Sequence, residues 1–348
     1  MGVGPVAAIT TQEAEASTKR RRLGVGRGKD KGPRLRNITW RTRLRRDKTL
    51  LLMCVPALIL IVLFNYLPMA GIVIAFENYD IYQGLIHSQF VGLQQFQQVL
   101  TDPGFWQAFE NTLVIAFVQL VLYFPIPIML ALLVNTILSQ RIRAFIQAVV
   151  FLPHFFTYVL VITFFQEFLG GAGVLNVFLN RHGISSWNIM TDPGTFKYLV
   201  TAQAVWKEAG WGLIVFLAAL AAIDQNLYEA AAVDGAGRWR RMRHITLPSL
   251  RGIVVLMLVL RLGNALSVGF EQMLIQRQAV GASAADVLDT YSYIYSGLGA
   301  GFGGTTSVGG SYSYGAAVGL FKAVLSLILI LGANKLAHMF GEDGLYRR

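Results

Sequence analysis

Long apolar runs alternate with short polar segments along most of the chain. Each run has about 18 or more residues with few charges, which is long enough for a helix to cross a bilayer. The sequence therefore predicts an all-α integral membrane protein with six transmembrane helices. Pro125 and Pro127 lie in the second run and are expected to kink it, because each removes a backbone hydrogen-bond donor. The runs are Leu50–Phe76, Leu113–Leu138, Phe145–Phe168, Tyr198–Ile223, Ile253–Phe270 and Gly315–Leu336.

Composition supports the membrane assignment and excludes several kinds of site. Charged residues make up 14% of the 348 residues, against about a quarter in soluble domains. The single cysteine, Cys54, excludes a disulfide framework, an iron–sulfur cluster and a cysteine zinc site. The five histidines form no H-x-x-x-H pair, so no metal site is expected. Gly28-Lys29 lacks the other residues of a phosphate-binding loop, so we expect no cofactor, no catalytic site and no ATPase site in this chain.

Positive charges are distributed unevenly among the polar segments. Alternate segments, starting with the N-terminal tail, hold 24 Lys and Arg residues, whereas the opposite set holds three. The positive-inside rule then predicts that both termini lie in the cytoplasm. The formal charge of +11 thus reflects topology, and the expected partner of the basic tail is membrane lipid, not nucleic acid. We expect a disordered tail over residues 1–49, a six-helix domain over 50–340 and a short cytoplasmic tail over 341–348.

The segment 224–250 is the longest of the predicted cytoplasmic links. Asp224 is placed to cap a short helix with small side chains, and Gly235 is expected to end it in a left-handed turn. A second, basic helix then runs through Arg238–Arg243 towards the fifth span. From the residues alone this link is either a helix lying on the membrane surface or a docking element for a cytoplasmic partner.

The same link carries a family signature. Glu229-Ala230-Ala231, Gly235 and Ile245-x-Leu247-Pro248 match the pattern E-A-A-x-x-x-G-x(9)-I-x-L-P of the membrane subunits of binding-protein-dependent ABC importers. The chain resembles one branch of this family, the LplB-like and polysaccharide-oligomer sugar permeases, from about Leu50 to Phe340. Matching stretches include YLPMAGIVIAFENYD, FPIPIMLALLVN and LRLGNALSVGFEQ. The long basic tail and the Gly297–Gly310 stretch depart from the branch.

The resemblance implies a MetI-like permease fold in a bacterial cytoplasmic (inner) membrane. It also implies a second homologous permease subunit, two cytoplasmic ATP-binding subunits that hold ATP and Mg²⁺, and an extracytoplasmic solute-binding protein. The expected substrate is a sugar, above all an acidic, polysaccharide-derived oligosaccharide, moved by alternating access. Alternatives are an ABC permease for a glycerol phosphodiester or a peptide, and a secondary transporter or channel.

The resemblance further implies that residues 229–236 form the coupling helix, which fits a groove of one ATPase. Glu229 and Asp234 would meet cations there, unless they only form a solvated helix face. Arg240 and its basic neighbours would contact the ATPase or lipid phosphate. The coupling residues expected are Glu229, Ala230, Ala231, Asp234, Gly235, Ala236 and Arg240.

Charged side chains inside the spans are the candidates for a substrate cavity, since such groups are costly in a bilayer. Lys207, Glu208 and Arg261 fall near the midplane, where a Glu208–Arg261 pair is geometrically plausible. Asn264 lies one turn beyond Arg261, and Lys322 is shallower in the sixth span. One interpretation is a cavity that contacts sugar hydroxyls or carboxylates. The other is a structural ion pair, with Lys207 and Lys322 reaching towards the membrane surface.

Overall fold

The computed structural model describes residues 47–299, 311–339 and 341. Residues 1–46 of the predicted basic tail, most of the Gly297–Gly310 stretch and nearly all of the predicted tail 341–348 lie outside these residues. The chain divides into two units, Met1–Tyr66 and Leu67–Arg348. The first contains α3 (Lys48–Ile61) and the π-helical turn η1 (Val62–Tyr66), in which no residue is buried. Such an apolar helix with every face exposed is suited to contact with lipid or with another apolar helix.

The second unit begins with short elements that precede its long helices. They are α4 (Leu67–Met69), η2 (Ala70–Phe76), β1 (Glu77–Asn78), α5 (Gly84–His87), β2 (Gln89–Phe90) and α6 (Gln94–Thr101). The two strands pair antiparallel, with Glu77 opposite Phe90 and Asn78 opposite Gln89.

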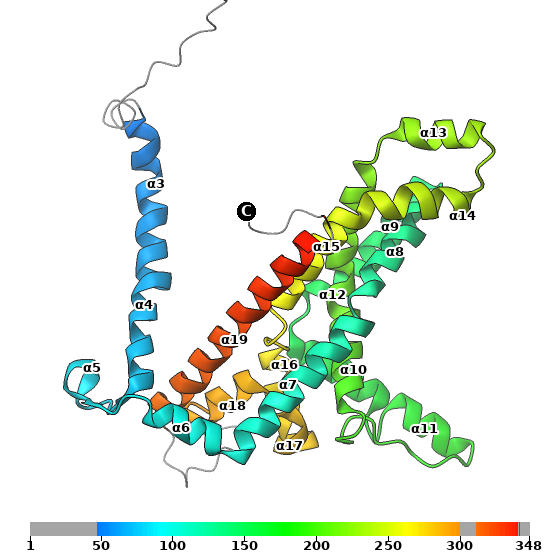
Figure 1. Ribbon diagram of the computed structural model, residues 1–348. Coiled ribbons are helices and arrows are strands. Elements are labelled where there is room, and N and C mark those ends of the chain that lie inside the picture. The colour runs from blue at the N-terminus through cyan, green and yellow to red at the C-terminus, as the bar shows by residue number, and fades with distance from the viewer. Residues whose placement is uncertain (1–46, 300–310, 340, 342–348) are drawn as a thin grey trace, which may run out of the picture. The chain divides into compact units, whose positions relative to one another are not determined.

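The second predicted span is a kinked pair of helices, as its prolines indicated. α7 (Pro103–Leu122) ends before Pro125, where α8 (Pro125–Asn135) begins in a new direction (Figure 1). Proline cannot donate a hydrogen bond inside a helix, but it is well tolerated in the first turn of one.

The third predicted span, Phe145–Phe168, is not one continuous helix. It contains α9 (Gln140–Phe151), the 3₁₀ turn η3 (Leu152–Phe155) and α10 (Tyr158–Leu169), followed by α11 (Val174–Arg181). Pro153 explains the break, because it removes a helical hydrogen bond and restricts the residue before it. The expectation of a single helix here was wrong, and the break frees the His154 carbonyl for another partner.

The helix α12 (Phe196–Ala221) is the centre of the second unit. It has thirteen buried residues and packs against α7, α8, α9, α10, α15 and α16. Gly210 permits the contact with α9, since a Cβ there would lie 2.3 Å from the Val150 carbonyl oxygen. Small residues bring helix backbones close together, which is how helices associate where apolar burial gives no advantage.

The remaining helices complete the membrane domain. They are α13 (Gln225–Val233), α14 (Arg238–Arg241), η4 (Met242–Thr246), α15 (Leu247–Gly263), α16 (Phe270–Val280), α17 (Ala282–Ala285), α18 (Leu288–Tyr295) and α19 (Tyr312–Met339). The described residues contain six helical stretches that are long and apolar enough to cross a membrane. The six-helix prediction is therefore confirmed.

Candidate functional site

The helical link between α12 and α15 forms as its sequence predicted. The Asp224 side chain accepts a hydrogen bond of 2.9 Å from the Asn226 N–H, and α13 ends at Val233. Gly235 follows with φ +73°, and the Ala236 N–H donates back to the Ala231 carbonyl at 2.8 Å. A Cβ on Gly235 would meet nothing within 4 Å, so the turn requires glycine for its dihedral angle and not for space. The segment 224–246 is called the hairpin below.

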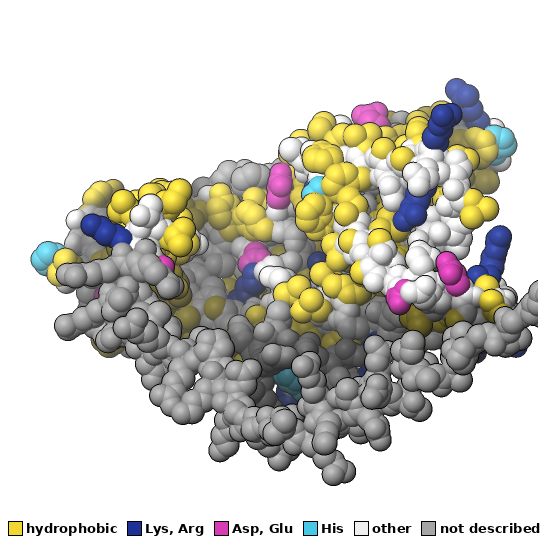
Figure 2. Space-filling model, turned by 90° about the horizontal axis from the view of Figure 1, so that it is seen from above, with side chains coloured by type: hydrophobic (Ala, Val, Ile, Leu, Met, Phe, Trp, Pro, Cys, Tyr) yellow, Lys and Arg dark blue, Asp and Glu magenta, His cyan; other side chains and the backbone are white. Residues whose placement is uncertain are grey.

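The first helix of the hairpin is largely exposed. No residue of α13 is buried, and Glu229, Ala230, Asp234, Gly235 and Arg240 are exposed, while Ala231 and Ala236 are half-buried. Large apolar side chains are exposed beside these small and charged residues, with Val233 at 89% and Trp239 at 71%. Figure 2, viewed from this end of the second unit, shows Lys and Arg side chains projecting beside apolar surface. Apolar side chains exposed around a charged motif are typical of a surface that a partner covers.

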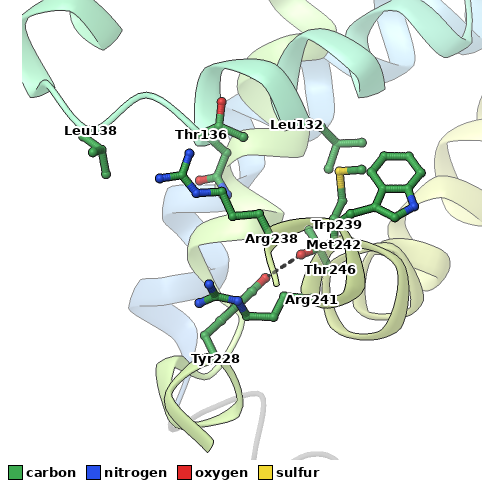
Figure 3. A pocket seen from close by; sticks show the side chains of 10 residues that line it. Leu132, Thr136, Leu138, Tyr228, Arg238, Trp239, Arg241, Met242 and Thr246 are labelled. Atoms are coloured by element: carbon green, nitrogen blue, oxygen red, sulfur yellow. Dashed lines mark hydrogen bonds between the residues drawn. The ribbon is translucent and has the colours of Figure 1, made fainter. Parts of the chain in front are cut away.

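A cavity of about 630 Å³ lies between the hairpin and the end of α8. A hydrogen bond of 2.9 Å between the Tyr228 and Thr246 hydroxyl groups spans it and ties α13 to η4 (Figure 3). Arg238 and Arg241 stand beside it, and the Arg241 Nε is buried with no partner among the described residues. The Tyr228–Thr246 bond therefore joins the two arms of the hairpin to each other.

The charges on α12 form a compact cluster. Lys207 Nζ lies 2.9 Å from Glu208 Oε1 and donates at 2.9 Å to the His154 carbonyl oxygen. Glu208 Oε2 lies 2.8 Å from His154 Nδ1. The expected Glu208–Arg261 pair was therefore wrong, because the break at η3 brings His154 to Glu208 first. Trp211 stacks on the His154 ring at 5.1 Å, which closes one side of this cluster.

Arg261 and Asn264 have other partners. The Arg261 guanidinium donates at 2.6 Å to Gln119 Oε1 and lies 5.0 Å from the Tyr123 ring centre. It also borders a small, mostly apolar hollow between α7, α15 and α19. Asn264 is exposed and donates only to the Leu260 carbonyl of its own helix, at 3.1 Å.

Lys322 also has a carboxylate partner. Its ammonium pairs with Asp289 on α18 and donates at 2.9 Å to the Ser267 hydroxyl. Of the two interpretations of the intramembrane cations, the structure gives ion-pair partners to Lys207 and Lys322. The sequence analysis did not identify Asp289 as the partner of Lys322, since Asp289 lies in a segment outside the predicted spans.

Two polar arrangements at the opposite end of the second unit also escaped sequence analysis. Arg277 and Asp286 form a buried ion pair, with 2.6 Å between Nε and Oδ1, and this bond raises the pKa of Arg277. Three buried amides, Gln203, Gln272 and Gln276, hydrogen-bond between α12 and α16. The spacing of Gln272 and Gln276, one helical turn apart, was the available signal for a shared face.

The third missed arrangement joins α7, α18 and α19. Asp102 caps α7 by accepting from the Gly104 N–H at 2.8 Å, and its Oδ2 accepts from the Tyr291 and Tyr314 hydroxyls. Burial alone would raise the pKa of Asp102, but these hydrogen bonds outweigh it and leave the pKa below its usual value. The Tyr314 hydroxyl therefore acts as a hydrogen-bond donor in this arrangement.

The fold defines a multi-pass membrane protein with an exposed helical hairpin on one side. Residues 123–337 match the model of the family described as "Binding-protein-dependent transport system inner membrane component". The chain belongs to this family, whose members are the permease subunits of ABC importers, so the predicted family and fold are confirmed.

Individual relatives cover almost the whole chain. Protein LplB of Bacillus subtilis (strain 168) is 41% identical over 312 residues, covering 89% of this chain and 95% of LplB. The polygalacturonan/rhamnogalacturonan transport system permease protein YteP of the same organism is 40% identical over 305 residues, covering 87% and 92%. A chain in the crystal structure of a bacterial alginate ABC transporter, in complex with an alginate pentasaccharide-bound periplasmic protein, superposes with a TM-score of 0.77. It is 34% identical and covers 88% of this chain and 99% of its own length.

Proposed function

We propose that this chain is the membrane-spanning permease subunit of an ATP-driven importer of oligosaccharides, with acidic, polysaccharide-derived chains as its main substrates. The support is the similarity to a permease named for polygalacturonan and rhamnogalacturonan and to a solved alginate transporter. These polymers contain uronic acids, so a carboxylated oligosaccharide is the first substrate to test.

The working importer would contain a second homologous permease, two ATP-binding subunits and an extracytoplasmic binding protein. ATP and Mg²⁺ would bind to the separate ATPase subunits, and this chain would provide passage without enzymatic activity or a cofactor of its own. The charge distribution supports placing both termini and the hairpin in the cytoplasm, with the basic tail near anionic lipid.

The observation that carries the proposal is the exposed hairpin. Its first helix has no buried residue and ends in a turn that only glycine adopts easily. We assign residues 229–236 to the contact with the ATPase, where movement of the ATPase pair would be transmitted through α12 and α15 to the spans. Glu229 and Asp234 are exposed beside small alanines, which suits a close, charge-complementary contact.

The intramembrane charges divide between two roles in this proposal. Lys207 and Glu208 would fix α12 against the broken third span, because their charges are already paired. Arg261 and the exposed Asn264 would face the substrate path, where Gln119 and Tyr123 hold the guanidinium in place.

A transport assay with a matched pair of glycine variants tests the hairpin. A Gly235→Val variant forces a branched side chain into the left-handed region, at roughly 1–2 kcal/mol. The expected result is a fall of about tenfold in ATP-driven uptake of trigalacturonate by proteoliposomes that contain the complete importer, since 1.4 kcal/mol corresponds to a factor of ten. The control is Gly237→Ala, because Gly237 has an ordinary φ of −67° and a Cβ there meets nothing within 4 Å.

The same assay separates the proposals. Uptake without ATPase subunits would contradict the importer and favour a secondary transporter or channel. Uptake of a glycerol phosphodiester or a peptide in place of both galactotriose and trigalacturonate would contradict the sugar substrate. Equal uptake by the Gly235→Val and Gly237→Ala variants would contradict the role of the hairpin. An Asn264→Ala variant with unchanged KM would remove Asn264 from the substrate path.

A further inference from the structure

A small polar cavity lies among the short elements at the start of the second unit. Its volume is about 320 Å³, which is at the lower end of the range for small-molecule sites. Elements that are distant in sequence meet there: β1, β2, α6 and the residue before α19. Its polar lining consists of Asn78, Gln89, Gln94, Gln95, Gln98 and Ser311.

Gln95 occupies a position where α6 would otherwise place an apolar side chain. Gln95 and Val99 are the two buried residues of α6, one turn apart on the same face. Val99 packs into a hydrophobic cluster with Ala75 and Phe105, as that face predicts. Gln95 is only 6% exposed, yet its Oε1 has no hydrogen-bond partner among the described residues. A buried acceptor without a partner is unfavourable, so a ligand that donates a hydrogen bond to it gains binding free energy.

The other amides of this cavity are also available to a ligand. Within the part of the chain that the structure describes, none of the side chains of Asn78, Gln89, Gln94 and Gln98 makes a hydrogen bond. A primary amide offers two donors and a carbonyl acceptor, so five of them around one cavity offer many bonds of both kinds. No Lys, Arg, Asp or Glu is among the residues that line the cavity.

This lining selects a class of ligand. A phosphate or an isolated carboxylate would meet no cation, and an apolar molecule would leave the amides without partners. Sugar hydroxyls both donate and accept, and a pyranose unit displays several of them around a small ring. Apart from Ser311, the lining residues belong to the segment 77–110, which holds no Lys or Arg and which the charge distribution assigns to the exterior.

We propose that this amide-lined cavity binds the hydroxyl groups of one sugar unit of an oligosaccharide arriving from outside, as a subsite separate from the path through the spans. The proposal rests on the proposed function for its side of the membrane and its kind of substrate. Gln95 would accept from a sugar hydroxyl at the buried end of the cavity, while the exposed Gln94 and Gln98 would hold the ring at its mouth.

Protection of an introduced cysteine measures occupancy of the cavity directly. Cys54 is exposed and would also be labelled, so it is first replaced by serine (Cys54→Ser). In this background, a Gln98→Cys variant places a thiol at the mouth of the cavity. The complete importer in lipid nanodiscs is labelled with a polar maleimide, with and without trigalacturonate or galactotriose. The matched control is Gln97→Cys, since Gln97 is exposed on the same helix but does not line the cavity.

The expected result is labelling slowed about tenfold at position 98 when the saccharide is at about ten times its Kd, with little change at position 97. Equal protection at both positions, in a complex that transports the saccharide, overturns the subsite and leaves the proposed function standing. Protection by the binding protein without saccharide also overturns it, because the cavity would then be a protein docking surface. Saccharide protection in a complex that transports no oligosaccharide instead contradicts the proposed function.

A Gln95→Met variant separates ligand binding from a structural role. Methionine has a similar shape but no hydrogen-bonding amide, so the variant removes an acceptor that has no partner in the protein. The expected result is an unchanged or raised Tm together with loss of most saccharide protection at position 98. A lowered Tm with full protection would contradict the assignment of Gln95. Gln94→Ala, an exposed substitution that leaves the helix face intact, tests the cavity independently if Gln95→Met does not fold.

Discussion

The two ends of the second unit are built in different ways. In Figure 1 the hairpin with α13 and α14 lies at one end and α17 and α18 lie at the other. At the α18 end, Asp102, Asp286 and Asp289 each connect separate helices through buried or half-buried polar bonds. At the hairpin end, α13 has no buried residue, and one hydroxyl–hydroxyl bond ties it to η4.

This difference indicates which end is held more rigidly. Breaking a buried polar bond leaves a polar or charged group without its partner, so such bonds resist separation of the helices that they join. An exposed helix with a single side-chain hydrogen bond to its neighbour moves at lower cost. The α18 end is therefore the fixed frame of the second unit, and the hairpin is its more adjustable end.

Removing the carboxylate of the Arg277–Asp286 pair should cause the largest loss of stability among these predictions. The two side chains are only 10% and 9% exposed, so Asp286→Ala leaves a guanidinium without its carboxylate in a nearly dry site. We expect a loss of about 3–5 kcal/mol, measured as the free energy of unfolding in detergent. A double variant, Arg277→Met with Asp286→Leu, should recover most of this loss.

The control for that prediction is Glu110→Ala, which removes an exposed carboxylate from α7. We expect a change within about 0.5 kcal/mol for it. Equal stability of the Asp286→Ala and Glu110→Ala variants would show that the buried pair does not hold the frame.

Tyr291→Phe should have a smaller effect, and one that depends on pH. Tyr291 is buried and donates to Asp102, so we expect a loss of about 2 kcal/mol at neutral pH. The pKa of Asp102 lies below its ordinary value of 3.8 in the folded protein. Its contribution to stability is therefore present above pH 3.8 and is lost as the pH falls through the lower folded pKa.

The variant changes the pH at which that contribution disappears. Without the Tyr291 hydroxyl the folded pKa of Asp102 rises, so the acid-induced loss of stability should be smaller and should finish at a higher pH. Thermal unfolding from about pH 7 down to about pH 2 measures this, because the transition lies below pH 3.8. Tyr293→Phe is the control, because its hydroxyl makes no hydrogen bond among the described residues. Identical pH profiles for the two variants would exclude the Asp102 bond as a source of stability.

The same comparison explains what the sequence could predict. The hairpin was predicted in detail because its determinants are local: Asp224 bonds two residues away, and the Gly235 turn needs only its own neighbours. The six spans followed from hydropathy, which also depends on neighbouring residues. The family signature lies in the hairpin as well, so the best-predicted region was also the most informative about function.

The partners of the charged residues within the spans could not be predicted in this way. Glu208 bonds His154 across 54 residues of chain, and Arg261 bonds Gln119 across 142. Which carboxylate a cation reaches depends on helix packing, and on the break at Pro153 that hydropathy does not show. The Glu208–Arg261 pairing failed for this reason, since depth in the membrane gives the height of a residue but not the direction of its helix face.

The smallest predicted effect is that of a variant in the hairpin, which tests whether α13 opens independently of the other helices. Asp224→Ala removes the cap of α13, which typically costs about 1 kcal/mol. Because α13 has no buried residue, this loss should stay local. Hydrogen exchange at the amides of residues 226–229 should become about fivefold faster, while exchange in α12 and the global unfolding temperature remain unchanged. Gln225→Ala is the matched control, since it changes the next exposed residue and leaves the cap intact.

Addition of the ATPase subunits gives a second test of the same hairpin. If the ATPase binds α13, exchange at residues 226–229 should become slower in both the Asp224→Ala and the Gln225→Ala variants. A global loss of stability in Asp224→Ala would instead show that the hairpin belongs to the same rigid frame as the α18 end.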